Sequence, residues 1–93
     1  MIKVVAHIEV IPEFLEEVIG IQREAVAITL KEPGCLEYAL FQQSDAPHQL
    51  TFVETWDSEE MLQIHMNTPF MTEKGKRLTG KIASKDIRLL KTL

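Results

Sequence analysis

Apolar and polar residues alternate with a period of two in four stretches of the chain, which is typical of strands. In the first stretch, residues 2–11, the alternate positions form one apolar face, which comprises Ile2, Val4, Ala6, Ile8 and Val10. The later stretches cover residues 35–43, 49–56 and 82–90. Turn-forming residues at 44–47 separate the second stretch from the third, so we expect these two strands to form a hairpin.

Between the first two predicted strands, apolar residues recur every three or four positions, as on the buried side of a helix. We expect this helix to begin at Pro12 and to end near Lys31, because proline followed by glutamates favours a helix start and Pro33-Gly34 favours its end. Its predicted buried stripe consists of Leu15, Val18, Ile19, Ala25, Val26 and Thr29, broadened by Phe14, Ile21 and Ile28.

A second helical region follows the predicted hairpin. We expect a short helix over residues 59–67, capped by Asp57 or Ser58. A break at Thr68-Pro69 should then lead into a further helical stretch that ends near Leu78.

The order strand, helix, strand, strand, helix, strand predicts one α+β domain over residues 1–93, with a ferredoxin-like βαββαβ topology and an antiparallel four-stranded sheet. Such a sheet carries helices on one face only. We therefore expect two sheets to pair face to face in a homodimer, because this is the simplest cover for the open face. A monomeric binding module with an exposed sheet face is the alternative.

Charge and composition narrow the classes of partner. The chain has 10 basic and 14 acidic residues and a net charge of −4, which disfavours nucleic acid. Its one basic group, Lys74, Lys76, Arg77 and Lys81, is expected on the exposed side of a helix and in the turn after it, and binding of a phosphate or anionic head group is the alternative. We expect a cytoplasmic protein with no membrane partner, since no apolar run approaches the length of a membrane span and the N-terminus lacks the pattern of a secretory signal. The single cysteine, Cys35, agrees with a reducing compartment and is expected to be buried and inert.

Standard catalytic signatures are missing from the sequence. There is no glycine-rich phosphate loop, HExxH, CxxC or nucleophile elbow. The three histidines, at positions 7, 48 and 65, lack the spacing of a helical metal pair, so no metal site is predicted. Any chemistry must use few protein groups, and no cofactor is expected.

A carboxyl group in an apolar row is the first candidate for chemistry. Glu54 shares one face of the third predicted strand with Leu50, Phe52 and Trp56. Burial would raise its pKa and suit it to proton transfer, whereas a salt bridge or a strand-edge position would make it structural. Trp56 fits either a core or interface anchor or a wall of a binding site.

Three further side chains could belong either to a binding or catalytic site or to the core or subunit interface, on sequence grounds. His65 projects from the apolar side of the short helix, where it could transfer protons near neutral pH or act as a cap or core hydrogen-bonding group. Tyr38 could point its hydroxyl into a pocket or make a cross-strand contact. His7 lies opposite the apolar face of the first strand and could line a cavity or the subunit interface.

Three segments together resemble one protein family. They are Lys31-Glu32-Pro33-Gly34-Cys35-Leu36-Glu37-Tyr38, Val53-Glu54-Thr55-Trp56 and His65-Met66-Asn67-Thr68-Pro69. In order and spacing they are similar to the antibiotic-biosynthesis monooxygenase family, especially its quinol monooxygenase-like members. The resemblance implies a dimeric α+β barrel with a pocket between sheet and helices in each subunit. It also implies oxidation of electron-rich phenols or dihydroquinones by O2 without metal or flavin.

The resemblance also assigns expected roles to residues. His65 is the expected base or proton relay, and Glu54 is expected to tune or orient it. Tyr38, Trp56 and Phe70 are expected to form the pocket wall, with Asn67 contacting a substrate oxygen. Relatives commonly carry a histidine at the position of Phe70, so the resemblance does not carry a specific substrate over to this chain.

Other activities of this fold group remain as alternatives. Haem degradation is disfavoured because residues 71–75 contain no histidine to bind iron. An isomerase acting on a small hydroxyketone-type metabolite would need a similar base in a dry pocket. A non-enzymatic dimeric binding module is the third reading, because a fold alone does not establish an activity.

Overall fold

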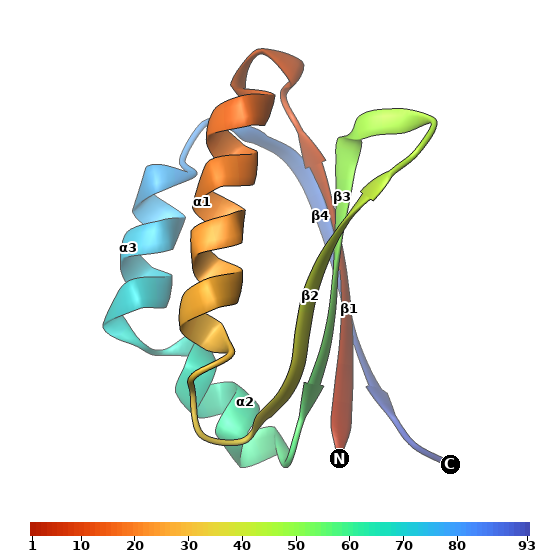
Figure 1. Cartoon of the computed structure of the whole chain (residues 1–93), viewed down its shortest axis with the longest axis vertical. Coiled ribbons are helices and arrows are strands. Elements are labelled where there is room, and N and C mark those ends of the chain that lie inside the picture. Colours follow the sequence, from red (N-terminus) through yellow and green to blue (C-terminus); the bar gives the residue numbers. More distant parts are fainter.

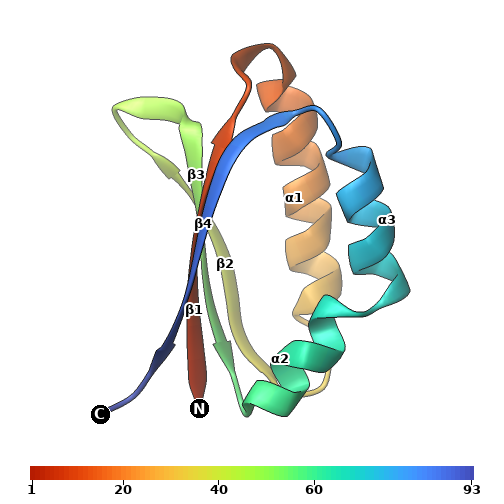
Figure 2. The same cartoon turned by 180° about the vertical axis from the view of Figure 1, so that it is seen from behind.

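A computed structural model describes residues 1–93 as one antiparallel sheet with the strand order β2-β3-β1-β4. Its strands are β1 (Ile2–Val10), β2 (Cys35–Gln43), β3 (Ala46–Trp56) and β4 (Ile82–Lys91). The helices α1 (Leu15–Thr29), α2 (Glu59–Met66) and α3 (Pro69–Arg77) all lie on one side of this sheet, as Figures 1 and 2 show. The predicted α+β, ferredoxin-like fold is thus confirmed.

The element boundaries differ from prediction at two turns. The first helical segment opens as a 3₁₀ turn over Pro12–Phe14, and α1 ends at Thr29 rather than near Lys31. The chain tightens there because the Glu32 backbone N–H donates to the Thr29 carbonyl, at 2.9 Å. Strand β3 begins at Ala46, so the hairpin turn is shorter than the predicted 44–47.

A bulge in β2 changes which residues face the helices. Cys35 lies opposite Trp56 and Glu37 lies opposite Thr55, so two residues of β2 span one step of β3. Leu36 was expected to share a face with Tyr38, but the bulge turns it outward, and it is 56% exposed. Cys35 takes the inward position and is only partly buried, contrary to the sequence expectation.

The core lies between the sheet and α1, and α1 buries two polar residues there. The side of α1 that packs on the sheet consists of Val18, Ile21, Gln22, Ala25 and Thr29, all of them buried. Ile28 was expected to widen this stripe but is exposed. Gln22 and Thr29 therefore occupy positions that helix packing reserves for apolar side chains.

Two side-chain caps set the break between α2 and α3. The Ser58 hydroxyl accepts from the Met61 backbone N–H at the start of α2, at 3.2 Å. The Thr68 hydroxyl accepts from the Met71 N–H at the start of α3 and donates to the carbonyl of His65, which ends α2. The predicted break at Thr68-Pro69 is confirmed, and it fixes the direction of His65 within α2.

Two glycines take a left-handed backbone, and only one of them is crowded. Gly34 (φ 81°) leads from α1 into β2, and a Cβ placed there would lie 2.5 Å from the Met61 side chain. Gly80 (φ 78°), between α3 and β4, has no side chain or backbone close to the corresponding position. Gly34 therefore allows close packing of α2 as well as a turn.

The helices leave β4 uncovered on both faces. Ile87 and Leu89 point toward the helix side, as their partners Ala6 and Val4 do, yet they are 49% and 47% exposed. Figures 1 and 2 show the C-terminal end of β4 pointing away from the layer of helices. None of the helices is both long enough and apolar enough to cross a membrane.

Candidate active site

A cavity of about 550 Å³ lies between the helices and the sheet and reaches the uncovered edge at β4. Most of its lining is apolar, which is usual for small-molecule sites of this size. The polar and ionisable lining groups include Gln22 from α1, Tyr38 and Glu54 from the sheet, His65 from α2 and Lys74 from α3. Groups distant in sequence thus meet in one hollow.

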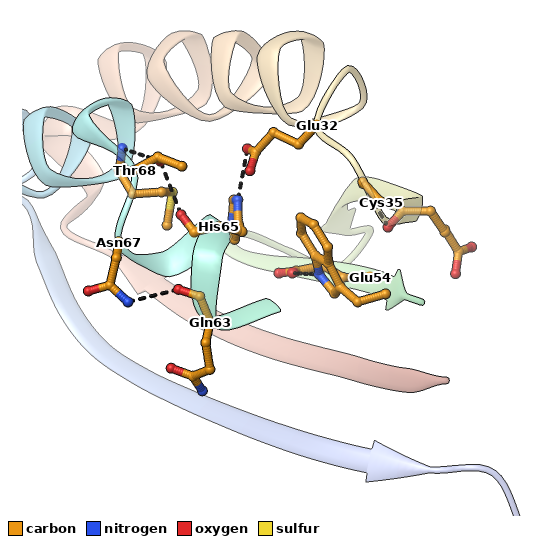
Figure 3. Close-up of polar contacts among 10 residues, drawn as sticks. Glu32, Cys35, Glu54, Gln63, His65, Asn67 and Thr68 are labelled. Atoms are coloured by element: carbon orange, nitrogen blue, oxygen red, sulfur yellow. Dashed lines mark hydrogen bonds and ion pairs between the residues drawn. The ribbon is translucent and has the colours of Figure 1, made fainter. Parts of the chain in front are cut away.

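His65 is held in one orientation at the wall of this cavity. Its side chain is 2% exposed, and its Nδ1 donates to Glu32 Oε2 at 2.9 Å. Its ring packs against Trp56, with centroids 4.7 Å apart, and against the edge of Tyr38 at 5.6 Å. Figure 3 shows Glu32 reaching from the end of α1 to the imidazole. This contact places the proton of a neutral imidazole on Nδ1 and leaves Nε2 able to accept another.

Glu54 is buried on the central strand β3, beside the same imidazole. Trp56 Nε1 donates to Glu54 Oε1 at 2.9 Å, a contact drawn in Figure 3. Burial raises the pKa of Glu54, while this hydrogen bond and the nearby His65 and Lys74 act in the opposite direction. The carboxyl group therefore keeps a proton to higher pH than an exposed glutamate does.

Tyr38 and Lys74 complete the set of ionisable groups in the cavity. Burial raises the pKa of the Tyr38 phenol, and the Glu54 carboxylate adds to the rise, so the hydroxyl stays protonated. Lys74 is 8% exposed, and its Nζ lies 5.4 Å from the centroid of the Phe52 ring. Burial also lowers the pKa of Lys74, although Glu54 opposes that shift.

No three His, Cys, Asp or Glu side chains converge in a way that could hold a metal ion. The lining groups themselves offer one side chain able to transfer protons near neutral pH, His65, and three able to form hydrogen bonds, Tyr38, Glu54 and Gln22.

Comparison with known protein families identifies the family of this domain. Residues 1–73 match the antibiotic biosynthesis monooxygenase family. The chain belongs to this family. The match ends one residue before Lys74.

Individual relatives resemble the whole chain at modest identity. YgiN of Escherichia coli K12, named a probable quinol monooxygenase, is 30% identical over 100 residues, which cover 97% of this chain and 96% of YgiN. The protein sll1783 of Synechocystis sp., described as uncharacterized, is 29% identical over 85 residues, which cover 88% of this chain. The matched region spans only 58% of the length of sll1783.

Solved structures of the family share the fold closely. One described as an antibiotic biosynthesis monooxygenase has a TM-score of 0.94 and 30% identity, covering 100% of this chain and 99% of that one. PA3566 from Pseudomonas aeruginosa has a TM-score of 0.93 and 26% identity, covering 99% and 93% of the two chains. Thus the family fold extends over the whole chain, including α3 and β4.

The structure of this family member brings together only some of the residues that the sequence suggested. His65, Glu54 and Tyr38 line the cavity, whereas Trp56 is fully buried and supports Glu54 and His65 from outside the lining. The group that orients His65 is Glu32 and not Glu54, which corrects the expected pairing.

Three predicted contact residues lie outside the cavity. Asn67 is exposed and its amide donates to the Gln63 carbonyl at 2.7 Å, as Figure 3 shows. Phe70 is only half-buried and is not among the residues that line the cavity, although it lies one helical turn before Lys74 on α3. His7 is exposed on the open face of the sheet, 2.9 Å from the Thr51 hydroxyl, because odd-numbered residues of β1 point away from the helices.

Sequence reasoning missed three polar groups of the site. Glu32 was named only within a segment that resembles the family, and nothing in its spacing indicates a contact with His65. Lys74 was expected on an exposed helix face, but its side chain is turned inward over Phe52. Gln22 and Lys74 did carry a signal, since each interrupts an apolar stripe at helical spacing.

Proposed function

We propose that this cavity oxidises a small phenol or dihydroquinone with O2, without a cofactor. The observation that carries the proposal is the buried His65–Glu32 pair at the wall of a largely apolar cavity. Such a site can remove a proton from a phenolic hydroxyl and keep bulk water from the ionised ring. The name of the E. coli relative, a probable quinol monooxygenase, supports the same class of substrate.

The reaction balances without a further reductant in either of two forms. In the oxidase form, a dihydroquinone passes two electrons and two protons to O2, which gives the quinone and hydrogen peroxide. In the monooxygenase form, one atom of O2 enters a phenol ring as the second quinone oxygen, and the other leaves as water. Both forms begin with loss of the phenolic proton, which makes the ring electron-rich enough to reduce O2.

Each site residue has a defined role in this proposal. His65 Nε2 accepts the phenolic proton, and Glu32 stabilises the imidazolium ion that results. Glu54 adds negative charge near the ring only when it is ionised, and because burial raises its pKa it ionises at higher pH than an exposed glutamate does. Tyr38 and Phe52, whose ring centroids are 5.1 Å apart, offer aromatic surface to the substrate ring.

Oxygen uptake with a panel of dihydroquinones tests the proposal. Wild-type protein treated with chelator should consume O2, and His65→Ala should reduce the rate by about 10²–10⁴-fold. His48→Ala is the matched control, because His48 lies outside the cavity. Uptake by His65→Ala equal to that of wild type would remove the proposal. Conversion of a hydroxyketone that proceeds equally without O2 would instead favour an isomerase.

We also propose that the protein forms a homodimer through the open sheet face. This face carries the half-exposed apolar side chains of Leu36, Phe41 and Leu90. Phe41→Asp should convert the dimer into a monomer in light-scattering measurements. Ile64→Asp, an equally exposed site on the helix side, should leave it dimeric. A monomeric wild type, or a dimeric Phe41→Asp variant, would contradict this assembly.

A further inference from the structure

Lys74 presents an unpaired ammonium group to the cavity. The side chain is more than nine-tenths buried, and its stem passes over the Phe52 ring, with Nζ 5.4 Å from the centroid. No carboxylate of the chain lies within salt-bridge distance of this group, and it makes no hydrogen bond to the chain. Nζ itself is not one of the fully buried atoms that lack a partner, so the ammonium group opens onto the cavity, where a ligand can reach it.

The charges around Lys74 favour an anionic ligand. The lining contains a single carboxyl group, Glu54, against two amines, Lys74 and Lys85. The other nearby carboxylate, Glu32, is already engaged by His65. Burial also raises the pKa of Glu54, so the one carboxyl group of the lining ionises less readily than an exposed glutamate does.

Gln22 gives the same cavity a second unpaired polar group. It is 1% exposed, lines the cavity from α1, and its carboxamide oxygen has no hydrogen-bond partner. An unsatisfied buried amide costs free energy unless a ligand completes its hydrogen bonds. The cavity is thus a polar recognition site as well as an apolar hollow.

We propose that Lys74 binds the oxyanion of an ionised phenol, so that the cavity selects ring compounds that bind as phenolates. This inference rests on the proposed function, because it names the form in which the substrate reacts. A cation within about 4–6 Å of an acidic group lowers that group's pKa by about 1–3 units. Lys74 therefore increases the fraction of bound substrate that can reduce O2, while His65 remains the group that accepts the proton.

Absorbance titration of bound 4-nitrophenol tests this assignment, because its phenolate and phenol absorb at different wavelengths. The wild-type protein should lower the pKa of bound 4-nitrophenol by about 1–3 units relative to free 4-nitrophenol. Lys74→Met should abolish the shift, whereas Lys74→Arg should keep most of it. Lys76→Met, on the exposed side of α3, is the matched control and should behave as wild type.

A second measurement covers the case in which Lys74→Met fails to fold, as judged by circular dichroism. Wild-type protein should bind 4-nitrophenolate at least about tenfold more tightly than the neutral ether 4-nitroanisole, the ratio that one unit of pKa shift implies. Equal affinities, no detectable phenolate binding, or a shift that survives in Lys74→Met would each overturn the proposal. Neither measurement uses O2. A protein that binds phenolate through Lys74 but consumes no O2 would therefore retain this inference and lose the proposed function.

Discussion

The hydrogen bond from Trp56 to Glu54 should stabilise the folded protein more at neutral pH than at acid pH. Both side chains are buried, and Nε1 lies 2.9 Å from the carboxyl oxygen. A hydrogen bond to a charged group contributes about 1.5–3 kcal/mol, and one between neutral groups about 0.5–1.5 kcal/mol. The ionised form of Glu54 should therefore gain about 1 kcal/mol more from Trp56 than the protonated form gains.

The raised pKa of Glu54 also makes the free energy of unfolding of the whole protein depend on pH. The stability associated with a protonated Glu54 is fully present below the ordinary glutamate pKa of about 4.3. It is lost as pH rises through the higher pKa of the folded state. Trp56→Phe removes the donor that opposes this rise, so its stability should fall more steeply with pH than that of wild type.

A double-mutant cycle of Trp56→Phe and Glu54→Gln isolates the charge-dependent part. The packing loss from the smaller ring, about 1–3 kcal/mol, occurs in both arms and cancels. Urea unfolding must be followed by circular dichroism, because Trp56 is the only tryptophan, and at one protein concentration, because a dimer's stability depends on it. The coupling free energy should be about 1 kcal/mol at about pH 8 and close to zero at about pH 4. A coupling that stays constant with pH, or grows toward acid, would refute this reasoning.

Three further predictions concern other contacts. Glu32→Gln should lower kcat about 10–100-fold with little change in KM, because the imidazole of His65 loses its orienting carboxylate. Steady-state oxygen uptake measures this, provided that the melting temperature of the variant is unchanged. A change in KM alone would contradict the prediction. Gly80→Ala should destabilise the folded protein by about 1–2 kcal/mol, through its left-handed backbone alone. Gly34→Ala should cost about 1–3 kcal/mol more, because its Cβ would also meet the side chain of Met61. Equal losses in urea unfolding would show that this close contact is unimportant. Lys74→Met should raise the free energy of unfolding near neutral pH by about 1 kcal/mol, because a lysine with a lowered pKa destabilises the folded state while it is charged. In thermal melts above the ordinary lysine pKa of about 10.4, this gain should vanish. A gain independent of pH would contradict the idea that the charge of Lys74 is its cause.

The fold could be predicted because each element follows from local rules. Alternation fixes the strands, apolar spacing fixes the helices, and Ser58 and Thr68 cap the two helices that follow the hairpin. The bulge that turns Leu36 outward could not be predicted. Its register depends on Cys35 pairing with Trp56, a contact between strands that the local pattern of β2 does not encode.

The orientation of the base was beyond sequence reasoning for a similar cause. Glu32 and His65 are 33 residues apart, and they meet only because the end of α1 lies against the last turn of α2. Helical spacing predicts which residues share one face of one helix. It does not predict which ends of two helices meet. The resemblance to the family suggested Glu54 as the partner of His65, but the hydrogen bond of Glu54 is to Trp56.

Polar residues within predicted apolar stripes are the part of the site that the sequence did carry. Gln22, Glu54 and Lys74 each interrupt such a stripe, on three different elements, and all three line the cavity. Thr29 interrupts the stripe of α1 in the same way, yet it does not reach the cavity, and its hydroxyl lies beside the phenol of Tyr38. An interruption therefore indicates a site only when several of them face one hollow, because a ligand can complete their hydrogen bonds there. Elsewhere, as at Thr29, a polar residue in an apolar stripe packs against the protein's own side chains and indicates no site.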